Sequence, residues 1–471
     1  PRRPYFMSHA SLAEEDWLAR SPRRNLRQLL TRALGDDGAQ CSEQEMQQHV
    51  ALLQRADAEN KLGRRKLYLL LDLDETLVFA QRLRAGASPA GHLIHVRGEA
   101  FDLQLRPGLS HFLSTTGESF IMYLYTMGDE EYVKAVLAVI DPKRIHFTGG
   151  VCCWRADQSR TLKTLERAVV EKQMALVVDD TPDVWQADLS NLLLVRRFQG
   201  HAGDNGLMQL SSQLCSLHKR FYPPAERAAW SLDDPLRQPP DARQLLAEAR
   251  GAALRRCLVA FTGVLPDTKD FGEIALCALV RQFGGEVTSS VEEATHLVAR
   301  QTEGWKQAAK IRQAAQRQGQ VAVVWDHWLL DTLCSWQRQP EERYRVPLEE
   351  MDGAEAGGAA EAAGPEAAEA AAAGGAPQAQ APRRDDCRVE RDSWASPGEG
   401  PTGSYTHALP APAPPSQSGQ KRDREGASEN NIARMTVAAY LREVKAKSSA
   451  AGVGGGAVAQ GAPAAAADMG T

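Results

Sequence analysis

Three short apolar runs, each followed at once by a polar or acidic side chain, restrict the possible folds of this chain more than any other feature. They occupy residues 67–71, 120–125 and 175–178. A nearly continuous apolar strand fits a parallel sheet that is covered on both faces. We therefore predict an α/β domain built on a parallel sheet. The side chains that follow the three runs are Asp72 and Asp74, Thr126, and Asp179 with Asp180.

In open α/β sheets, ligands bind beyond the carboxyl ends of the strands. The five strand-end residues are therefore expected to meet in one small volume. Each group by itself has a simpler explanation as a helix cap or a turn. The joint occurrence after three separate strands favours a common site.

The residue types at these strand ends suit phosphoryl transfer. The Asp72 carboxylate can attack a phosphoryl group and form an aspartyl-phosphate, which divides one difficult displacement into two easier steps. Asp74, two residues further on, can protonate the leaving oxygen and later deprotonate the attacking water. Thr126 can hydrogen-bond the transferring phosphoryl group. Several carboxylates in one pocket repel each other, and Mg²⁺ suits them because it binds hard oxygen ligands.

Such a site also needs a cation to offset the charge on the equatorial phosphoryl oxygens. Lys163, which precedes Asp179 by 16 residues, is the candidate, and we expect it on a helix that leads into the third strand. Arg160 is a competitor in the same segment.

The segment from Asp72 to Leu77 resembles the DxDxT signature of haloacid-dehalogenase-type phosphatases. More narrowly, residues 42–347 resemble the phosphatases of the RNA polymerase II C-terminal domain (CTD) that associate with TFIIF. Besides DxDxT, the resemblance rests on Leu105-Arg106-Pro107-Gly108-Leu109, Tyr125-Thr126-Met127-Gly128 and Val177-Val178-Asp179-Asp180.

This resemblance implies a haloacid-dehalogenase-like fold and a role for each matching residue. Asp72 would be the nucleophile and Asp74 the general acid/base, while Thr126 and Lys163 would stabilise the phosphate. Thr76 would support the nucleophile loop, and Arg106 would position the site. The implied Mg²⁺ site consists of Asp72, Asp74 (through its main-chain carbonyl), Asp179 and Asp180.

A second region, residues 252–347, resembles a BRCT domain. An apolar strand ends at Thr262-Gly263, and many BRCT domains bind phosphopeptides with such a pair and a lysine from a later helix. Gly304 stands where relatives often place this lysine, so Lys306 or Lys310 would replace it. A scaffolding role without phosphopeptide binding is the alternative for this domain. His296 and Trp328 are expected to be structural.

Composition sets the remaining boundaries. Residues 1–41 form an N-terminal segment that is expected to be partly disordered, residues 42–225 the phosphatase domain, and residues 226–251 a linker. In residues 351–380, 20 of 30 residues are Ala or Gly, which bury too little apolar surface to offset the entropy of ordering. We therefore expect residues 348–471 to be a disordered tail. Residues 431–447 are an exception, with apolar side chains at helical spacing.

Several functional classes do not fit the composition. A formal net charge of -5 argues against a protein that coats nucleic acid. No apolar run approaches the length of about 18–20 residues that a membrane helix needs. The eight cysteines are scattered, which makes a zinc site or a disulfide framework improbable.

The sequence thus favours a Mg²⁺-dependent protein serine/threonine phosphatase. By resemblance, its substrate is the phosphorylated CTD of RNA polymerase II, its location is the nucleus, and residues 431–447 bind TFIIF through one of its subunits. One alternative is a phosphatase of other phosphoproteins or small phosphate esters. A non-catalytic BRCT scaffold is the second. The preferred heptad serine is left open.

Overall fold

The structure is a computed structural model that describes residues 43–349 and 351, apart from Ala85, residues 155–161, 224–229 and 267–269, and Gln318. The expected N-terminal segment, most of the expected tail and the candidate helix at 431–447 lie outside these residues. The described residues from 54 onward belong to one compact unit. None of the helices described is both long and apolar enough to cross a membrane.

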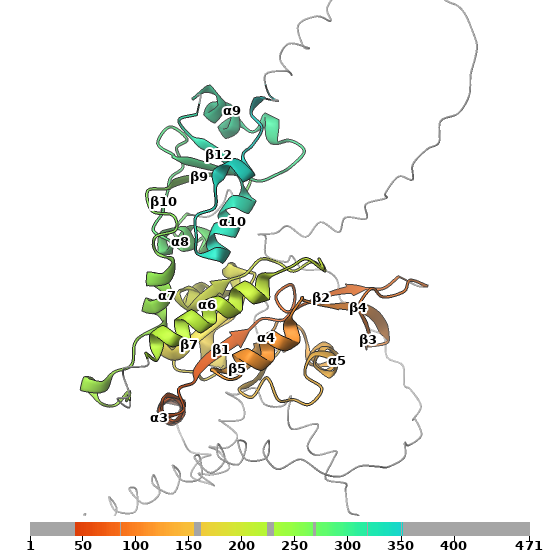
Figure 1. The fold of residues 1–471 in the computed structure, drawn as a ribbon, viewed down its shortest axis with the longest axis vertical. Coiled ribbons are helices and arrows are strands. Elements are labelled where there is room, and N and C mark those ends of the chain that lie inside the picture. Colours follow the sequence, from red (N-terminus) through yellow and green to blue (C-terminus); the bar gives the residue numbers. More distant parts are fainter. Residues whose placement is uncertain are drawn as a thin grey trace, which may run out of the picture. The chain divides into compact units, whose positions relative to one another are not determined.

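A five-stranded sheet forms the centre of the first domain (Figure 1). All of its paired strands are parallel, in the order β6-β5-β1-β7-β8. The three predicted strands are confirmed, and they are neighbours with β1 in the middle. The strands are β1 (Leu67–Leu71), β5 (Phe120–Tyr125), β6 (Gly150–Cys152), β7 (Ala175–Asp179) and β8 (Leu192–Leu194).

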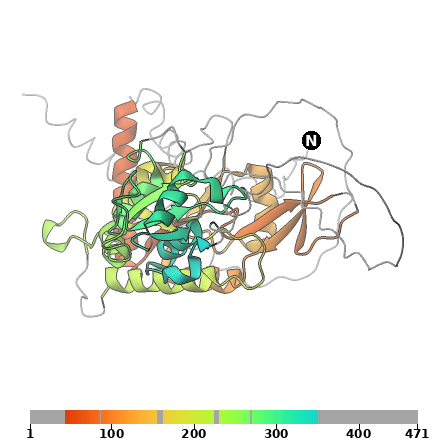
Figure 2. The same cartoon turned by 90° about the horizontal axis from the view of Figure 1, so that it is seen from above.

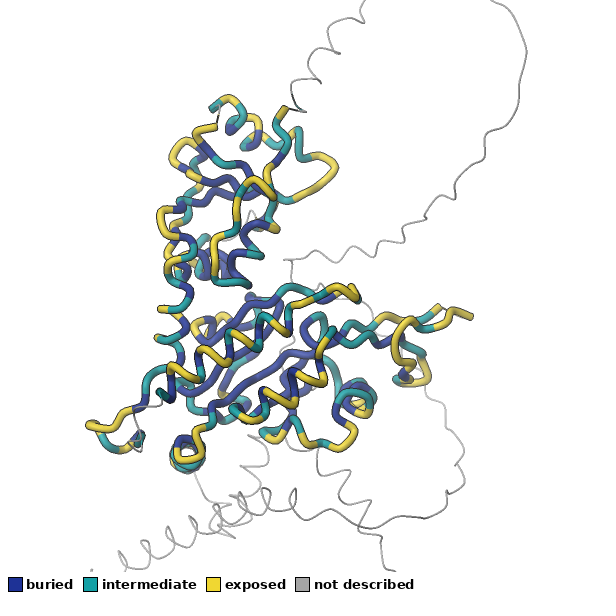
Figure 3. The backbone as a smooth tube through the Cα atoms, in the orientation of Figure 1, coloured by how far each residue is buried: buried dark blue, intermediate teal, exposed yellow. Residues whose placement is uncertain are grey.

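The strands of this sheet are apolar except for Asp179 at the end of β7, because helices cover both faces. Every residue of β1 and of β7 is buried. Figure 3 shows the buried strands at the centre, with flanking helices exposed on their outer sides. The helices and 3-10 helices of this domain are α3 (Glu43–Gly63), α4 (Leu109–Thr116), α5 (Glu130–Ile140), η2 (Leu165–Arg167), η3 (Lys172–Met174), η4 (Pro182–Asn191) and α6 (Gly206–Phe221).

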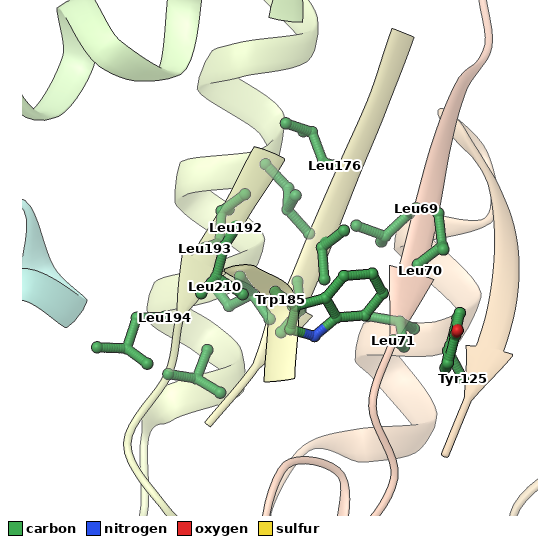
Figure 4. Close-up of a cluster of buried hydrophobic side chains, with 14 of the residues drawn as sticks. Leu69, Leu70, Leu71, Tyr125, Leu176, Trp185, Leu192, Leu193, Leu194 and Leu210 are labelled. Atoms are coloured by element: carbon green, nitrogen blue, oxygen red, sulfur yellow. The ribbon is translucent and has the colours of Figure 1, made fainter. Parts of the chain in front are cut away.

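Trp185 of η4 fills the core next to the ends of the central strands. It is fully buried, and its ring contacts that of Tyr125 edge-on at 5.0 Å between centroids. Leucines of β1, β7 and β8 surround it in Figure 4. The core thus reaches the edge of the sheet where the polar strand-end residues begin.

A small antiparallel sheet lies between Thr76 and β5 in the chain. The stretch of sequence there is short, and a sheet of this size fits within it. Its order is β2-β4-β3, and the strands are β2 (Val78–Arg82), β3 (His92–Val96) and β4 (Glu99–Leu105). The turn from β3 to β4 uses Arg97 and Gly98, both with positive φ (51° and 79°), as tight hairpin turns require. In Figures 1 and 2 these strands lie to one side of the parallel sheet.

The second domain is a smaller parallel α/β unit. Its four-stranded sheet has the order β10-β9-β11-β12. Gly284 has φ +85°, and a Cβ there would lie 2.2 Å from the Gly251 carbonyl oxygen, so a side chain is excluded at this turn. The elements are β9 (Leu258–Thr262), α8 (Ala275–Gln282), β10 (Glu286–Val287), β11 (His296–Ala299), η6 (Trp305–Gln307), α9 (Ala309–Gln316), β12 (Ala322–Trp325), α10 (Asp326–Ser335) and η7 (Glu341–Tyr344).

The expected linker at 226–251 contains regular structure, which corrects the sequence-based expectation. It holds η5 (Pro235–Arg237) and α7 (Ala242–Arg250). The Asp241 side chain caps α7 by accepting the Arg243 N–H, and Leu246 is fully buried. Some of the Pro, Asp and Arg residues that indicate a linker therefore lie at the start of a helix that packs into the protein.

Candidate active site

The carboxyl ends of β1 and β7 bring three aspartates together. The Asp72 N–H donates to the Val178 carbonyl at 2.9 Å, which joins the two strand ends directly. Asp72, Asp179 and Asp180 each offer a carboxylate oxygen within 4.8 Å of the other two, and all three residues are buried. The structure therefore brings together the residues that would have to share one cation.

Lys163 lies between two of these carboxylates. Its Nζ donates to Asp72 Oδ1 at 2.5 Å and to Asp179 Oδ2 at 2.6 Å. Burial alone would lower the pKa of Lys163, but the charges of Asp179 and Asp72 outweigh burial and raise it. The lysine is therefore charged at neutral pH, as a phosphoryl-binding cation must be.

Lys163 is not on a helix, contrary to the sequence-based expectation. It precedes η2, whose cap is the Thr164 side chain, and its own N–H donates to the Val184 carbonyl at 2.7 Å. An extended segment can therefore direct the lysine into the sheet edge. The competitor Arg160 lies outside the described residues.

Asp74 is held by two hydroxyl groups beside the aspartate cluster. It accepts hydrogen bonds from Thr126 Oγ1, at 3.3 Å, and from the Tyr132 hydroxyl. Burial raises the pKa of Asp74, although both hydroxyls oppose this. A carboxyl with a raised pKa retains a proton at higher pH, which suits a general acid.

Sequence reasoning missed Tyr132. It lies in the first turn of α5, where Asp129 caps the helix by accepting the Tyr132 N–H at 3.1 Å. An aromatic residue on a half-buried helix indicates core packing, so nothing in the local pattern pointed to Asp74.

The two acidic residues of the β7 end have different surroundings. Asp179 Oδ1 accepts the Thr181 N–H at 2.9 Å, and its Oδ2 accepts both Lys163 and the Trp185 indole N–H, the latter at 2.8 Å. Protein donors thus occupy both Asp179 oxygens, which makes it the residue that orients Lys163. Burial, followed by the charge of Asp179, raises the pKa of Asp180 to about 6.

The donor set fits a hard divalent cation. Burial and the neighbouring Asp179 raise the pKa of Asp72 well above its usual range, even with Lys163 in contact. Lys163 alone therefore leaves the buried carboxylates short of positive charge. Clustered carboxylate oxygens are the ligands that Mg²⁺ prefers, and Asp72, Asp179 and Asp180 together offer such a cluster.

Thr76 and Arg106 tie the nucleophile turn to its surroundings. Thr76 Oγ1 donates to Asp180 Oδ1 at 3.3 Å. The buried Arg106 donates to the Thr76 carbonyl at 2.9 Å and forms an ion pair with Asp204 at 2.7 Å. Both residues therefore contact the turn, as the resemblance implied, while neither is placed to react with a substrate.

In the second domain, Lys310 rather than Lys306 contacts the end of β9. Lys310 Nζ donates to the Phe261 carbonyl at 3.0 Å, next to Thr262 and Gly263, whereas Lys306 lies over the Trp305 ring.

His296 is structural. It is buried, stacks on Trp328 at 4.8 Å between ring centroids, and has Thr295 and Glu341 as hydrogen-bond partners.

Comparison with known proteins shows which families the chain resembles. Residues 67–222 match the family described as NLI interacting factor-like phosphatase. The chain is 24% identical over 336 residues to RNA polymerase II C-terminal domain phosphatase-like 4 of Arabidopsis thaliana, covering 63% of this chain and 73% of the relative. It is 22% identical over 321 residues to an RNA polymerase II C-terminal domain phosphatase of Caenorhabditis elegans, covering 62% of this chain and 48% of the relative.

The fold is that of a solved phosphatase. The fission yeast RNA polymerase II CTD phosphatase Fcp1, in a variant form bound to beryllium fluoride, superposes with a TM-score of 0.54 at 21% identity. The match covers 62% of this chain and 100% of that one. This similarity shows that the described residues share the α/β fold of that phosphatase.

Proposed function

We propose that this chain is a Mg²⁺-dependent protein serine/threonine phosphatase, because residues 67–222 match the NLI interacting factor-like phosphatase family and the chain is similar to RNA polymerase II CTD phosphatases. Its proposed substrate is the phosphorylated heptad-repeat CTD of RNA polymerase II, in the nucleus. The observation that carries the proposal is the contact of Lys163 with both Asp72 and Asp179 beside the half-buried Asp74.

In the first step, the Asp72 carboxylate attacks phosphorus while the bond from phosphorus to the serine or threonine oxygen breaks. Asp74 gives its proton to that leaving oxygen. Lys163 and Thr126 stabilise the transferring phosphoryl oxygens. The products are the free hydroxyl side chain and an aspartyl-phosphate on Asp72.

In the second step, Asp74 removes a proton from a water molecule that attacks the phosphorus. The bond between phosphorus and Asp72 breaks, phosphate leaves, and Asp74 is again protonated for the next cycle. Asp72 and Asp180 would hold Mg²⁺, whose charge would offset the phosphoryl oxygens. Asp179 keeps Lys163 in position throughout.

A comparison of Asp72→Asn with the wild type tests the mechanism. Asn cannot form the acyl-phosphate, so we expect no magnesium-dependent hydrolysis of phosphorylated heptad peptides. The matched control is Asp57→Asn, which changes a carboxylate that accepts from the Tyr68 hydroxyl at 2.7 Å, near the other end of β1. Full activity of Asp72→Asn would refute the nucleophile, and an inactive wild type would favour the scaffold alternative.

The substrate class needs a separate comparison. We expect a higher kcat/KM for phosphorylated heptad peptides than for a small aryl phosphate. Equal values would favour the alternative of a phosphatase for other phosphoproteins or small esters.

A phosphopeptide site on the BRCT-like domain is a second proposed function. Arg300 follows β11, and its Nε and Nη2 atoms are buried without a hydrogen-bond partner in the described residues, although its Nε lies 4.0 Å from Asp326 Oδ2 in an ion pair. Its Cβ lies 3.5 Å from the position that a Gly263 side chain would take. Together with Thr262, the Gly263 N–H and Lys310, this arginine would bind a phosphate group.

Binding of a phosphorylated heptad peptide to catalytically inactive Asp72→Asn protein tests this site by fluorescence anisotropy. We expect Lys310→Gln and Arg300→Gln to weaken binding more than Lys306→Gln does. Unchanged binding in both variants would favour a scaffolding domain. A TFIIF subunit is the proposed partner of residues 431–447, and a chain truncated after residue 430 should lose that interaction in a direct binding assay.

A further inference from the structure

Arg197 lies beside the aspartate cluster and has no role in the proposed reaction steps. We infer that it is a positioning residue for the metal site, which holds Asp180 in a single orientation by linking it to Glu75. This inference rests on the proposed phosphatase function.

The guanidinium group of Arg197 contacts both acidic segments of the site. Its Nε lies 2.7 Å from Asp180 Oδ2, and its Nη1 lies 3.5 Å from Glu75 Oε2. Its Nη2 donates to Thr181 Oγ1 at 3.0 Å. One side chain thus joins the turn after β1 to the turn after β7.

The backbone around Arg197 is fixed as well. The Phe198 N–H donates to the Glu75 carbonyl at 2.6 Å, and the Arg196 carbonyl accepts from Arg106 at 2.8 Å. The backbone segment that carries Arg197 can therefore not move away from the site without breaking these contacts.

Glu75 itself has a conformation that needs support. Its φ is 58°, in the left-handed region that costs a non-glycine residue of the order of 1–3 kcal/mol and is kept only where the surroundings enforce it. The hydrogen bond from its N–H to the Val78 carbonyl, at 2.7 Å, and the contacts with residues 197 and 198 supply that constraint.

The consequence for Asp180 is a fixed carboxylate plane. Its Oδ2 has both Arg197 and the Thr181 hydroxyl as partners, the latter at 3.0 Å, and Thr76 donates to Oδ1 at 3.3 Å. A carboxylate held on both oxygens can present its remaining lone pairs toward Asp72 in only one way. Such outer partners of a metal ligand raise metal affinity by roughly 10–100-fold.

The charge of Arg197 and its positioning role predict opposite effects of Arg197→Gln on the affinity for Mg²⁺. A positive charge next to a cation site repels the cation, so removal of the charge alone would strengthen Mg²⁺ binding. Loss of positioning would weaken it. Because Arg197 also lowers the pKa of Asp180, Mg²⁺ binding is compared at about pH 9, where this carboxyl is ionised with or without the arginine. The direction of the change then decides between the two, without any measurement of catalysis.

Isothermal titration of Mg²⁺ into the metal-free full chain is the test. We expect Arg197→Gln to weaken binding by about tenfold. Arg197→Lys should fall between Arg197→Gln and the wild type, because lysine keeps the charge but not the planar fork. The matched control is Arg220→Gln, since Arg220 pairs with Glu248 at 2.5 Å and its side chain is 36% exposed, against 33% for Arg197.

Glu75→Gln provides an independent variant in case Arg197→Gln does not fold. It should weaken Mg²⁺ binding in the wild type and have a smaller effect in an Arg197→Lys background. Equal or tighter Mg²⁺ binding by folded Arg197→Gln, or independent effects of residues 75 and 197, would overturn the inference. A wild type that binds Mg²⁺ but hydrolyses no phosphopeptide would refute the proposed function and leave this inference intact.

Discussion

Replacement of Lys163 by methionine removes the cation on which the aspartate cluster depends. Methionine has a similar length and fills the same space, so the main loss is the charge. The variant leaves Asp72 and Asp179 buried and adjacent without their shared partner. We expect it to be both less stable and inactive.

The size of the stability loss follows from the burial. Lys163 is 4% exposed and forms two ion pairs of 2.5 and 2.6 Å. Removal of one partner from a buried ion pair costs about 3–5 kcal/mol. Asp72 can relieve part of this by taking up a proton, so we expect about 3 kcal/mol at pH 7, or roughly 6–12 °C in Tm.

The pH dependence provides a sharper test than the magnitude. In the wild type, the raised pKa of Lys163 keeps its contribution to stability constant through neutral pH and lets it decline only in strongly alkaline solution. In the variant, the pKa of Asp72 rises further above its unfolded value. A raised pKa means that the protonated Asp72 favours the folded state at low pH and that this stability is lost as pH increases. The variant should therefore approach the stability of the wild type as pH falls.

Thermal unfolding of metal-free protein between about pH 5 and pH 8 measures both effects. Lys134→Met is the control, because Lys134 forms an exposed pair with Glu130 at 3.0 Å, and such pairs contribute under about 1 kcal/mol. A Lys163→Met variant as stable as Lys134→Met, or one whose deficit grows as pH falls, would refute the electrostatic reasoning.

Three further predictions concern the residues around the cluster. Tyr132→Phe removes a hydrogen bond that lowers the pKa of Asp74, so the alkaline limb of the kcat–pH profile should move to higher pH, and an unchanged profile would exclude Asp74 as the general acid. Because burial raises the pKa of Asp180 to about 6, protons compete with the cation, and Mg²⁺ affinity measured calorimetrically should increase from about pH 5 to pH 7 and then level off. Arg106→Ala leaves Asp204 and the Thr76 carbonyl without their partner and should lower the free energy of unfolding in denaturant titration by about 3 kcal/mol, whereas a loss under about 1 kcal/mol would contradict its anchoring role.

The parts of the site that the sequence predicted are those that local patterns determine. Asp72, Thr126 and Asp179 follow apolar strands, and parallel pairing then fixes which ends meet. Tyr132 and Arg197 could not be found in this way. Their partners, Asp74 and Asp180, lie 58 and 17 residues away in the chain, and only tertiary packing brings them near.

Two other differences have the same origin. The spacing of Lys163 from Asp179 predicts that it belongs to the site but carries no information on backbone conformation, so the expected helix is not found there. The composition of residues 226–251 predicts a linker, whereas Asp241 in this segment caps a helix whose Leu246 and Arg250 are buried. Composition describes the average solubility of a segment, whereas a few buried side chains decide whether it packs.

The position of β1 at the centre of its sheet has a consequence for the life of the newly made chain. Asp72 is synthesised before its partners: its strand needs both β5 and β7 as neighbours, and the lysine and acidic pair follow about a hundred residues later. Contacts so distant in sequence form slowly, after long loops have closed. A ribosome-bound fragment that ends before β7 therefore carries a nucleophile without the groups that activate it, and catalytic competence is acquired only when translation of the whole domain is complete.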